Sequence, residues 1–296
     1  MKPKVAAIGT FDGVHRGHRS VLGVLTDFAK GQGMEAIAIT FNQHPLALID
    51  PSRIPNELTP LWKKKKLLAE AGALPHVLDF DEPLRATTAA QWMKKLKDDF
   101  GVKALVIGYD NTFGCDGVNL SIEDYKKLGE KEGIDILTAE EVKGVSSSAI
   151  RKAIAAGDVE SAHKMLGRPY SITAKVEKGN NLGHTLGFPT ANINIPEGQA
   201  IPKTGVYAAI VKTLDDGVKH PAMVNIGVRP TVMRGDDMVI EAHLINWQGN
   251  LYDKEITVRF LQRLRDEKKF ESIEALRQQL DSDRRETLEV LREYDL

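Results

Sequence analysis

The first half of the chain alternates short apolar runs with amphipathic stretches. Four segments have the continuous apolar pattern of buried strands: 4–8, 35–41, 103–107 and 134–137. Between them, apolar residues recur three or four positions apart, most clearly in 89–100, which is typical of helices with one buried face. This alternation predicts an α/β unit whose parallel sheet is covered by helices on both faces.

The pattern changes after about Gly167. Strand-like runs punctuated by Gly, Pro and Asn then follow: 172–176, 206–213, 222–226, 239–245 and 256–261. Such spacing predicts an antiparallel sheet or a small antiparallel β-barrel, and we take the barrel as the expected fold. The segment from 270 onward has the pattern of one charged amphipathic helix, whose apolar face is predicted to contain Ile273, Leu276 and Leu280. We therefore expect two domains, 1–168 and 169–296.

The composition of the chain bears on which binding partners and metal sites it can have. Among 296 residues, 40 Lys and Arg balance 41 Asp and Glu, so no overall field favours nucleic acid or an anionic membrane. The basic run Lys63–Lys66 is interpreted as a solvated helix face. Cys115 is the only cysteine, which excludes an internal disulfide and a cysteine zinc cluster. With no signal peptide or membrane-length apolar run, we expect a cytoplasmic protein, either a monomer or a weak oligomer.

The strongest local motif is Gly9–His18, with the sequence GTFDGVHRGH, where the first strand meets the first helix. Ligands of doubly wound sheets bind outside the carboxyl ends of the strands, and the free N–H groups of a helix N-terminus attract phosphate. His15 and His18 are three residues apart with Gly17 between them, so both rings can face one point and donate hydrogen bonds to phosphate. The alternative, two surface histidines in a turn, is disfavoured by this spacing.

A second polar motif precedes a helix further along the chain. It comprises Ser146, Ser147, Ser148 and Arg151. The hydroxyls can cap the helix, or they can hold phosphate oxygens together with the guanidinium. We expect both roles.

The second half of the chain carries a different set of candidates. Thr190 and Asn192 alternate along a predicted strand and therefore face one side, where their oxygens suit Mg²⁺. A strand edge with two satisfied polar side chains is an equally good interpretation of that pair. Glu241 stands in an apolar run, where a carboxylate is either a general base for an alcohol or a salt-bridged structural residue.

With these motifs in place, the N-terminal half resembles the nucleotidylyltransferase domain of bacterial bifunctional FAD synthetases, a Rossmann-like parallel sheet. The matching stretches are 9–18, 40–45, 108–114 and 146–151. The resemblance implies that ATP is bound by a glycine turn, two histidines and the serine segment, namely Gly9, Phe11, Asp12, His15, His18, Ser146, Ser147, Ser148 and Arg151. It implies flavin contacts at Asn42, His44, Asp110 and Phe113, and catalysis aided by both histidines.

The stretch 175–283 resembles the flavokinase domain of the same family. The resemblance implies that Thr190 and Asn192 bind Mg-ATP and that Glu241 activates the primary hydroxyl of riboflavin. It places Gly179 and Gly183 in a glycine loop on ATP, and Glu241 and Arg265 at the flavin. The chain departs from the family pattern at Asn42 and Gln43, where the family usually has Asp and Pro. It also departs at Leu182 and His184, where bacterial relatives usually carry basic residues.

Together, these resemblances imply a bifunctional flavin enzyme with riboflavin, FMN and ATP as its substrates and Mg²⁺ as its metal. Riboflavin would be phosphorylated to FMN, and FMN adenylylated to FAD with release of pyrophosphate. Two rivals remain open: an enzyme in which one half is degenerate, and a non-enzymatic flavin-binding regulator. His163, His220 and His243 have no evident partners in the sequence and are assigned to the surface or to packing.

Overall fold

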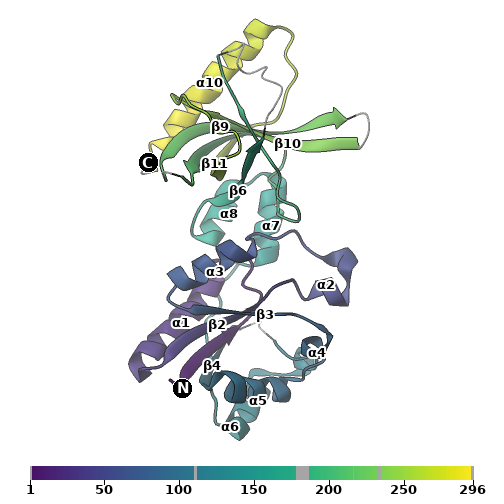
Figure 1. Cartoon of the computed structure of the whole chain (residues 1–296), viewed down its shortest axis with the longest axis vertical. Coiled ribbons are helices and arrows are strands. Elements are labelled where there is room, and N and C mark those ends of the chain that lie inside the picture. The colour runs from purple at the N-terminus through teal and green to yellow at the C-terminus, as the bar shows by residue number, and fades with distance from the viewer. Residues whose placement is uncertain (1, 110–111, 178–186, 216, 232–234, 295–296) are drawn as a thin grey trace. The chain divides into compact units, whose positions relative to one another are not determined.

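The computed structural model describes residues 2–109, 112–177, 187–215, 217–231 and 235–294. By its internal contacts the chain divides into two compact units, Met1–Ser147 and Ser148–Leu296 (Figure 1). In the part of the chain so described, no helix combines the length and the apolar character needed to cross a membrane.

The first unit is built on a five-stranded sheet in the order β3-β2-β1-β4-β5, and every pair is parallel. Its strands are β1 (Lys4–Ile8), β2 (Glu35–Phe41), β3 (Leu74–Leu78), β4 (Val102–Ile107) and β5 (Asp135–Thr138). The predicted α/β parallel sheet is confirmed. Because β1 lies between β2 and β4, the strand order reverses beside β1, and the carboxyl ends of these strands form the usual ligand position of such a sheet.

Helices cover both faces of this sheet. They are α1 (Arg16–Gln32), α2 (Leu46–Ile49), α3 (Leu61–Glu70), α4 (Glu82–Arg85), α5 (Ala89–Phe100) and α6 (Ile122–Glu132), with single 3₁₀ turns at Pro51–Arg53 and Gly117–Asn119. Alternate β1 residues enter two separate cores: Ala6 and Ile8 pack toward α5, whereas Val5 and Ala7 pack toward α1. The continuous apolar pattern of the strand follows from this two-sided burial.

The second unit begins with α7 (Ser147–Ala156) and α8 (Val159–Leu166) and continues as a closed antiparallel barrel in the order β10-β7-β6-β11-β8-β9. The barrel strands are β6 (Tyr170–Glu177), β7 (Ala191–Ile193), β8 (Gly205–Thr213), β9 (Lys219–Thr231), β10 (Gly235–Leu244) and β11 (Glu255–Arg265). The predicted small barrel with a terminal helix is confirmed.

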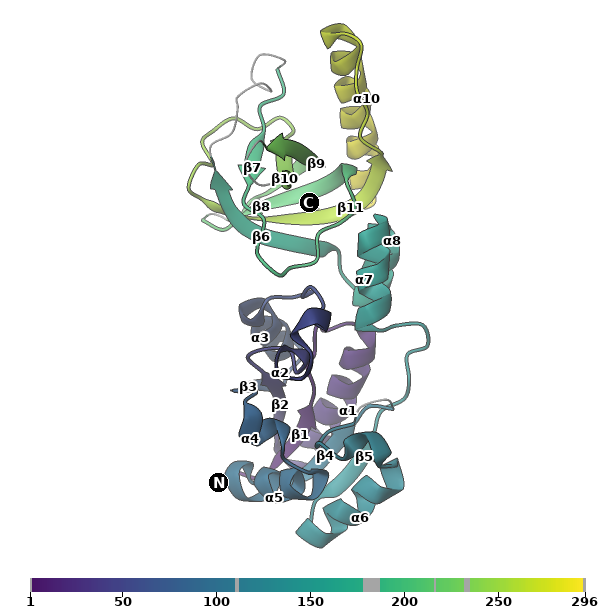
Figure 2. The ribbon, with the colours of Figure 1, turned by 90° about the vertical axis from the view of Figure 1, so that its right-hand side faces the viewer.

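The terminal helix α10 (Ile273–Leu291) lies alongside the barrel and contacts β8, β9 and β11 (Figure 2). Its predicted apolar face is partly wrong, because Ile273 is 65% exposed. The buried residues of the helix are instead Asp283, Thr287 and Leu291. Two of these three are polar, and one of them, Asp283, bonds to Arg265 of β11, so a polar contact as well as apolar packing holds α10 to the barrel.

Candidate active sites

The turn that follows β1 has an unusual backbone. Phe11 and Val14 have positive φ angles of 48° and 40°. Such angles are costly for a β-branched residue, and strain of this kind is concentrated at functional sites. Two donors hold the turn against the end of β2: the Thr40 hydroxyl and the Lys64 ammonium each bond to the carbonyl oxygen of Thr10 at 3.1 Å. These two bonds fix the Thr10 carbonyl group at the start of the turn.

His15 and His18 lie together at the start of α1. His15 is the N-cap residue, and its Nδ1 accepts a hydrogen bond from the backbone N–H of His18 at 3.3 Å. The two rings stack with centroids 3.6 Å and planes 15° apart. Gly17 permits this approach, because a Cβ atom there would lie 3.1 Å from the His15 ring. Both imidazoles are thus gathered at a helix N-terminus, where a phosphate group binds favourably.

The surroundings of His18 favour its neutral form. Its pKa lies well below the ordinary value of 6.5, first because burial desolvates the ring and then because the charges of His15 and Lys64 oppose protonation. Part of the side chain still reaches solvent, but Nδ1 is buried and has no hydrogen-bond partner among the described residues. A buried polar atom without a partner costs free energy, which a ligand donor or acceptor would recover.

Lys64 overturns part of the interpretation of the run Lys63–Lys66 as a solvated helix face. The side chain of Lys64 is only 7% exposed, and it shares the buried face of α3 with Leu67 and Leu68. Burial lowers the pKa of its ammonium group. The three- and four-residue spacing to two leucines was the one signal in the sequence that could have revealed this residue.

Asp12 joins three segments of the first unit. Its carboxylate accepts hydrogen bonds from the backbone N–H groups of Leu58, at 3.0 and 3.1 Å, and Thr59, at 3.1 Å. Its carbonyl oxygen accepts one from the Ser147 hydroxyl at 2.9 Å. The serine motif is thereby attached to the histidine turn. Ser148 and Arg151 follow in α7.

A cavity of about 440 Å³ lies beside this turn. Residues from the ends of β1 and β2 line it together with aromatic and loop side chains, including Gly9, Phe41, Phe80, Trp92 and Phe113. Phe113 is held in place through its backbone, whose N–H and carbonyl oxygen bond to the Tyr125 hydroxyl at 2.9 and 2.8 Å. The cavity is large and apolar enough to take a planar aromatic ring system.

Two of the predicted flavin contacts, Asn42 and His44, form hydrogen bonds within loops. The amide of Asn42 donates to Asp79 Oδ1 at 2.8 Å and accepts from the N–H of Phe80 at 3.0 Å. His44 Nδ1 accepts from the N–H of Leu46 at 3.1 Å. Both residues therefore shape loops whose neighbours, Phe80 and Pro45, line the cavity. The third, Asp110, lies outside the described residues.

In the barrel, polar side chains form one row across neighbouring strands. Glu241 of β10 is directly opposite Asn192 of β7 and Asn225 of β9. Asn225 is in turn opposite Val206 of β8, which pairs with Arg265 of β11. Directly opposed residues of antiparallel strands share a face and have Cβ atoms about 5 Å apart. The register therefore brings Asn192, Glu241 and Asn225 together.

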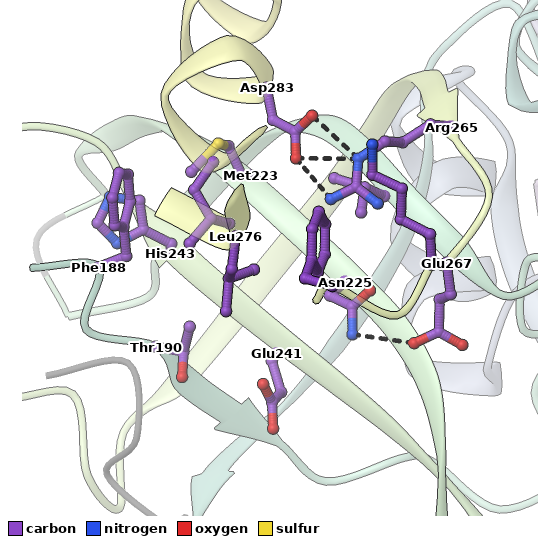
Figure 3. A pocket seen from close by; sticks show the side chains of 14 residues that line it. Phe188, Thr190, Met223, Asn225, Glu241, His243, Arg265, Glu267, Leu276 and Asp283 are labelled. Atoms are coloured by element: carbon purple, nitrogen blue, oxygen red, sulfur yellow. Dashed lines mark hydrogen bonds and ion pairs between the residues drawn. The ribbon is translucent and has the colours of Figure 1, made fainter. Parts of the chain in front are cut away.

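This row borders a cavity of about 320 Å³ roofed by α10. Thr190, just before β7, lines it together with Glu241, and Leu276 and Leu280 come from the helix (Figure 3). A second cavity, of about 460 Å³, also reaches Thr190 and is lined by residues that include Trp247, Leu251 and Tyr252. Two separate cavities of the barrel thus meet at one hydroxyl side chain.

Arg265, predicted to contact flavin, lines the first cavity but is bonded to the helix above it. Its Nε and Nη2 donate to the carboxylate of Asp283 at 3.0, 3.1 and 2.7 Å (Figure 3). Gln279 adds a hydrogen bond to the same carboxylate at 2.7 Å. Asp283 is only 1% exposed, so this is a buried ion pair between β11 and α10. No motif or spacing in the sequence indicates this pair.

Two further residues of the cavity were missed by sequence reasoning. Asn225, whose position opposite Glu241 could not be known without the register, donates to Glu267 Oε1 at 3.4 Å. His243, assigned from the sequence to the surface or to packing, lines the cavity and bonds to the carbonyl oxygen of Pro189 at 2.9 Å. Gly179 and Gly183, with Leu182 and His184, lie outside the described residues.

The chain thus holds two candidate sites, one at the carboxyl ends of the parallel strands and one on the barrel, and the comparisons show the class of protein to be a transferase with two domains. A family model described as FAD synthetase matches residues 1–151, and one described as riboflavin kinase matches residues 166–291. The relative from Pseudomonas fluorescens is 37% identical over 94% of this chain and 90% of its own length, and the one from Bacillus subtilis is 33% identical over 96% and 91%. Both are named bifunctional riboflavin kinase/FMN adenylyltransferase, and the chain belongs to that family.

One solved structure is similar along nearly the whole chain. It is described as a macrolide-efflux protein from Streptococcus pneumoniae, and it covers 97% of this chain and 94% of its own at 29% identity and a TM-score of 0.88. The arrangement of a parallel sheet followed by a barrel is therefore found in an experimental structure as well.

Proposed function

We propose that this chain makes FAD from riboflavin in two ATP-dependent steps. Residues 169–296 phosphorylate riboflavin to FMN, and residues 1–168 adenylylate FMN. The observation that carries the proposal is the presence, in one chain, of a histidine pair at the N-terminus of α1 and of a carboxylate in a polar row beside an apolar cavity. A degenerate half would be expected to have lost one of these arrangements.

In the kinase step, riboflavin occupies the 320 Å³ cavity below α10. The Glu241 carboxylate accepts the proton of the primary ribityl hydroxyl as that oxygen attacks the γ-phosphorus of ATP. The bond from the γ-phosphorus to the bridging oxygen breaks, and ADP leaves. Asn192 and Asn225 flank Glu241 and orient it.

The nucleotide of this step fits the second barrel cavity. That cavity offers aromatic and apolar surface at Trp247, Leu251 and Tyr252 for a base, and it meets the flavin cavity at Thr190. A phosphate chain that starts there therefore ends beside Thr190, within the region that Glu241 borders. Reaction between two bound substrates requires this kind of convergence.

The residues at this junction fit a magnesium ion that arrives with ATP. The Thr190 hydroxyl and the Asn192 amide oxygen are hard, neutral donors, and both positions are fixed, one at the cavity and one by register. Among the described residues, no three His, Cys, Asp or Glu side chains are grouped to hold a metal, which suits an ion bound mainly through phosphate oxygens. Bound there, Mg²⁺ would neutralise charge on the phosphates.

In the adenylylation step, the flavin ring of FMN occupies the 440 Å³ cavity beside Phe113. A phosphate oxygen of FMN attacks the α-phosphorus of ATP, and pyrophosphate leaves. His15, His18, the serines of 146–148 and Arg151 hold the phosphates of ATP, with Gly9, Phe11 and Asp12 shaping the turn. No covalent intermediate is needed, because positioning and stabilisation of charge suffice.

A time course of product formation tests the proposal. The purified protein is incubated with riboflavin, ATP and Mg²⁺, and the flavins are separated by chromatography. We expect FMN to appear first and FAD later. Tight flavin binding without either product would show instead a regulator that binds flavin, and FMN alone, even when FMN is supplied, would show that the first unit lacks activity.

A further inference from the structure

His243 occupies a position that no role in the two reactions accounts for. It stands two residues after Glu241 on β10, so both side chains lie on the same face of the barrel, and both line the flavin cavity. Its ring meets the ring of Phe188 edge-on, with centroids 5.1 Å apart (Figure 3). Phe188 is itself buried against Met223 and Ile245.

The hydrogen bond of His243 extends the contact between β10 and the chain beyond the end of the β7 ladder. Strand β7 pairs with β10 only from Ala191 to Ile193. One residue earlier comes Thr190, and before it Pro189, which has no N–H group to continue the ladder. Its carbonyl oxygen can still accept, and it takes a hydrogen bond from His243 Nδ1 at 2.9 Å. Thr190 is therefore held on one side by strand pairing and on the other by this side chain.

The chemistry of the bond fixes the form of the ring. A carbonyl oxygen only accepts, so Nδ1 carries the proton and donates it. Burial lowers the pKa of His243, an effect reinforced by the positive charge of Arg284 and opposed by the Pro189 carbonyl. The ring is thus a neutral donor with a defined tautomer, as expected of a residue that orients a neighbour.

We propose that His243 is a positioning residue for the kinase reaction: by holding the Pro189 carbonyl, it sets the place of Thr190, and hence of the transferred phosphate, relative to Glu241. This inference rests on the proposed role of Thr190 at the ATP phosphates. It assigns to His243 an effect on the nucleotide side of the reaction although the residue lies on the wall of the flavin cavity.

Two polar variants of similar size separate positioning from simple packing. In His243→Asn the amide nitrogen can take the place of Nδ1 and keep the bond to Pro189, whereas in His243→Gln the amide reaches toward the place of Nε2. We expect His243→Gln to lower kcat and raise KM for Mg-ATP, with a combined loss of about tenfold or more. Relative to His243→Gln, His243→Asn should recover most of that loss. In both variants the loss in kcat and in KM for Mg-ATP should exceed any change in the dissociation constant of riboflavin.

The outcomes distinguish this inference from the proposed function. If both variants lose activity equally, or if the loss lies in riboflavin affinity, His243 does not act through Pro189 and the inference is wrong. If the unchanged protein makes no FMN at all, the proposed function itself has failed. Circular dichroism melting and the adenylylation of supplied FMN, which does not use the barrel site, check that each variant is folded and correctly quantified.

Discussion

The buried pair between Arg265 and Asp283 makes a quantitative prediction about the roof of the flavin cavity. Replacing Asp283 by Asn keeps the size of the side chain but leaves the guanidinium without its counter-charge. Removing one partner of a buried ion pair typically costs about 3–5 kcal/mol. The Arg265 side chain keeps some exposure, at 18%, and also donates to the Asp266 carbonyl. We therefore expect Asp283→Asn to lower the free energy of local opening of α10 by about 3 kcal/mol, at the low end of that range.

Hydrogen exchange measured by mass spectrometry on peptides from α10 reports this loss directly. A change of about 3 kcal/mol in the local opening free energy corresponds to exchange on the order of 100-fold faster. Peptides from the first unit serve as the internal reference. Because α10 roofs the cavity, the affinity for riboflavin should also fall, as measured by the quenching of flavin fluorescence.

The same helix supplies a matched control. Asp281 pairs with Arg284 at 3.4 Å, and both side chains are more than 40% exposed. Exposed pairs contribute about 0–1 kcal/mol, so Asp281→Asn should leave exchange almost unchanged. Equal exchange in the two variants would refute the claim that the buried pair holds α10.

A double replacement separates the two possible roles of Arg265. Arg265→Met with Asp283→Leu removes both charges and should restore much of the protection of α10, because apolar pairs often substitute well for buried ion pairs. If Arg265 also contacts flavin, as the family resemblance implies, riboflavin affinity will stay low in that double variant.

Two further predictions concern the first unit. Cys115 is the only cysteine, is exposed and lines the 440 Å³ cavity of the first unit. FMN with ATP should therefore slow its alkylation severalfold, whereas riboflavin that binds only to the barrel should not. Equal rates would place FMN outside that cavity. Because the pKa of His18 is lowered in the folded state, its stabilising contribution is present above about pH 6.5 and is lost as the pH falls through the folded pKa. Proton NMR should show the His18 ring titrating well below 6.5, and ATP should raise that pKa because the phosphate charge favours the protonated ring; a titration near 6.5 in the free protein would contradict the account.

Much of the architecture could be predicted from the sequence because its physical cause is local. Residues 5–8 of β1, for example, are buried on both faces and are therefore all apolar. Edge strand β3 was missed, because it is only partly buried and contains Pro75 and His76. The barrel was predicted from its runs of strand-forming residues, and its polar row could not be, because register depends on how distant strands pair.

The residues missed at the sites share one feature, which is a partner far away in the sequence. Lys64 bonds to Thr10 and His243 to Pro189, each across 54 residues. Locally, Lys64 is one of four consecutive lysines, and only the packing of α3 decides which of them is buried. Asp283 has the same character, since a carboxylate in a charged helix is ordinarily exposed. Motif spacing found the candidates that act within one segment but not those that join two.

The central claim is that one chain holds two independent active sites, and a crossed assay of two variants tests it most directly. Glu241→Gln and His18→Gln are each supplied with riboflavin and ATP, and separately with FMN and ATP. We predict that Glu241→Gln makes FAD from FMN but no FMN from riboflavin, and that His18→Gln makes FMN but no FAD. The assignment of the two sites would be contradicted if either replacement stopped both reactions in a folded protein. It would be contradicted equally if either replacement stopped neither reaction.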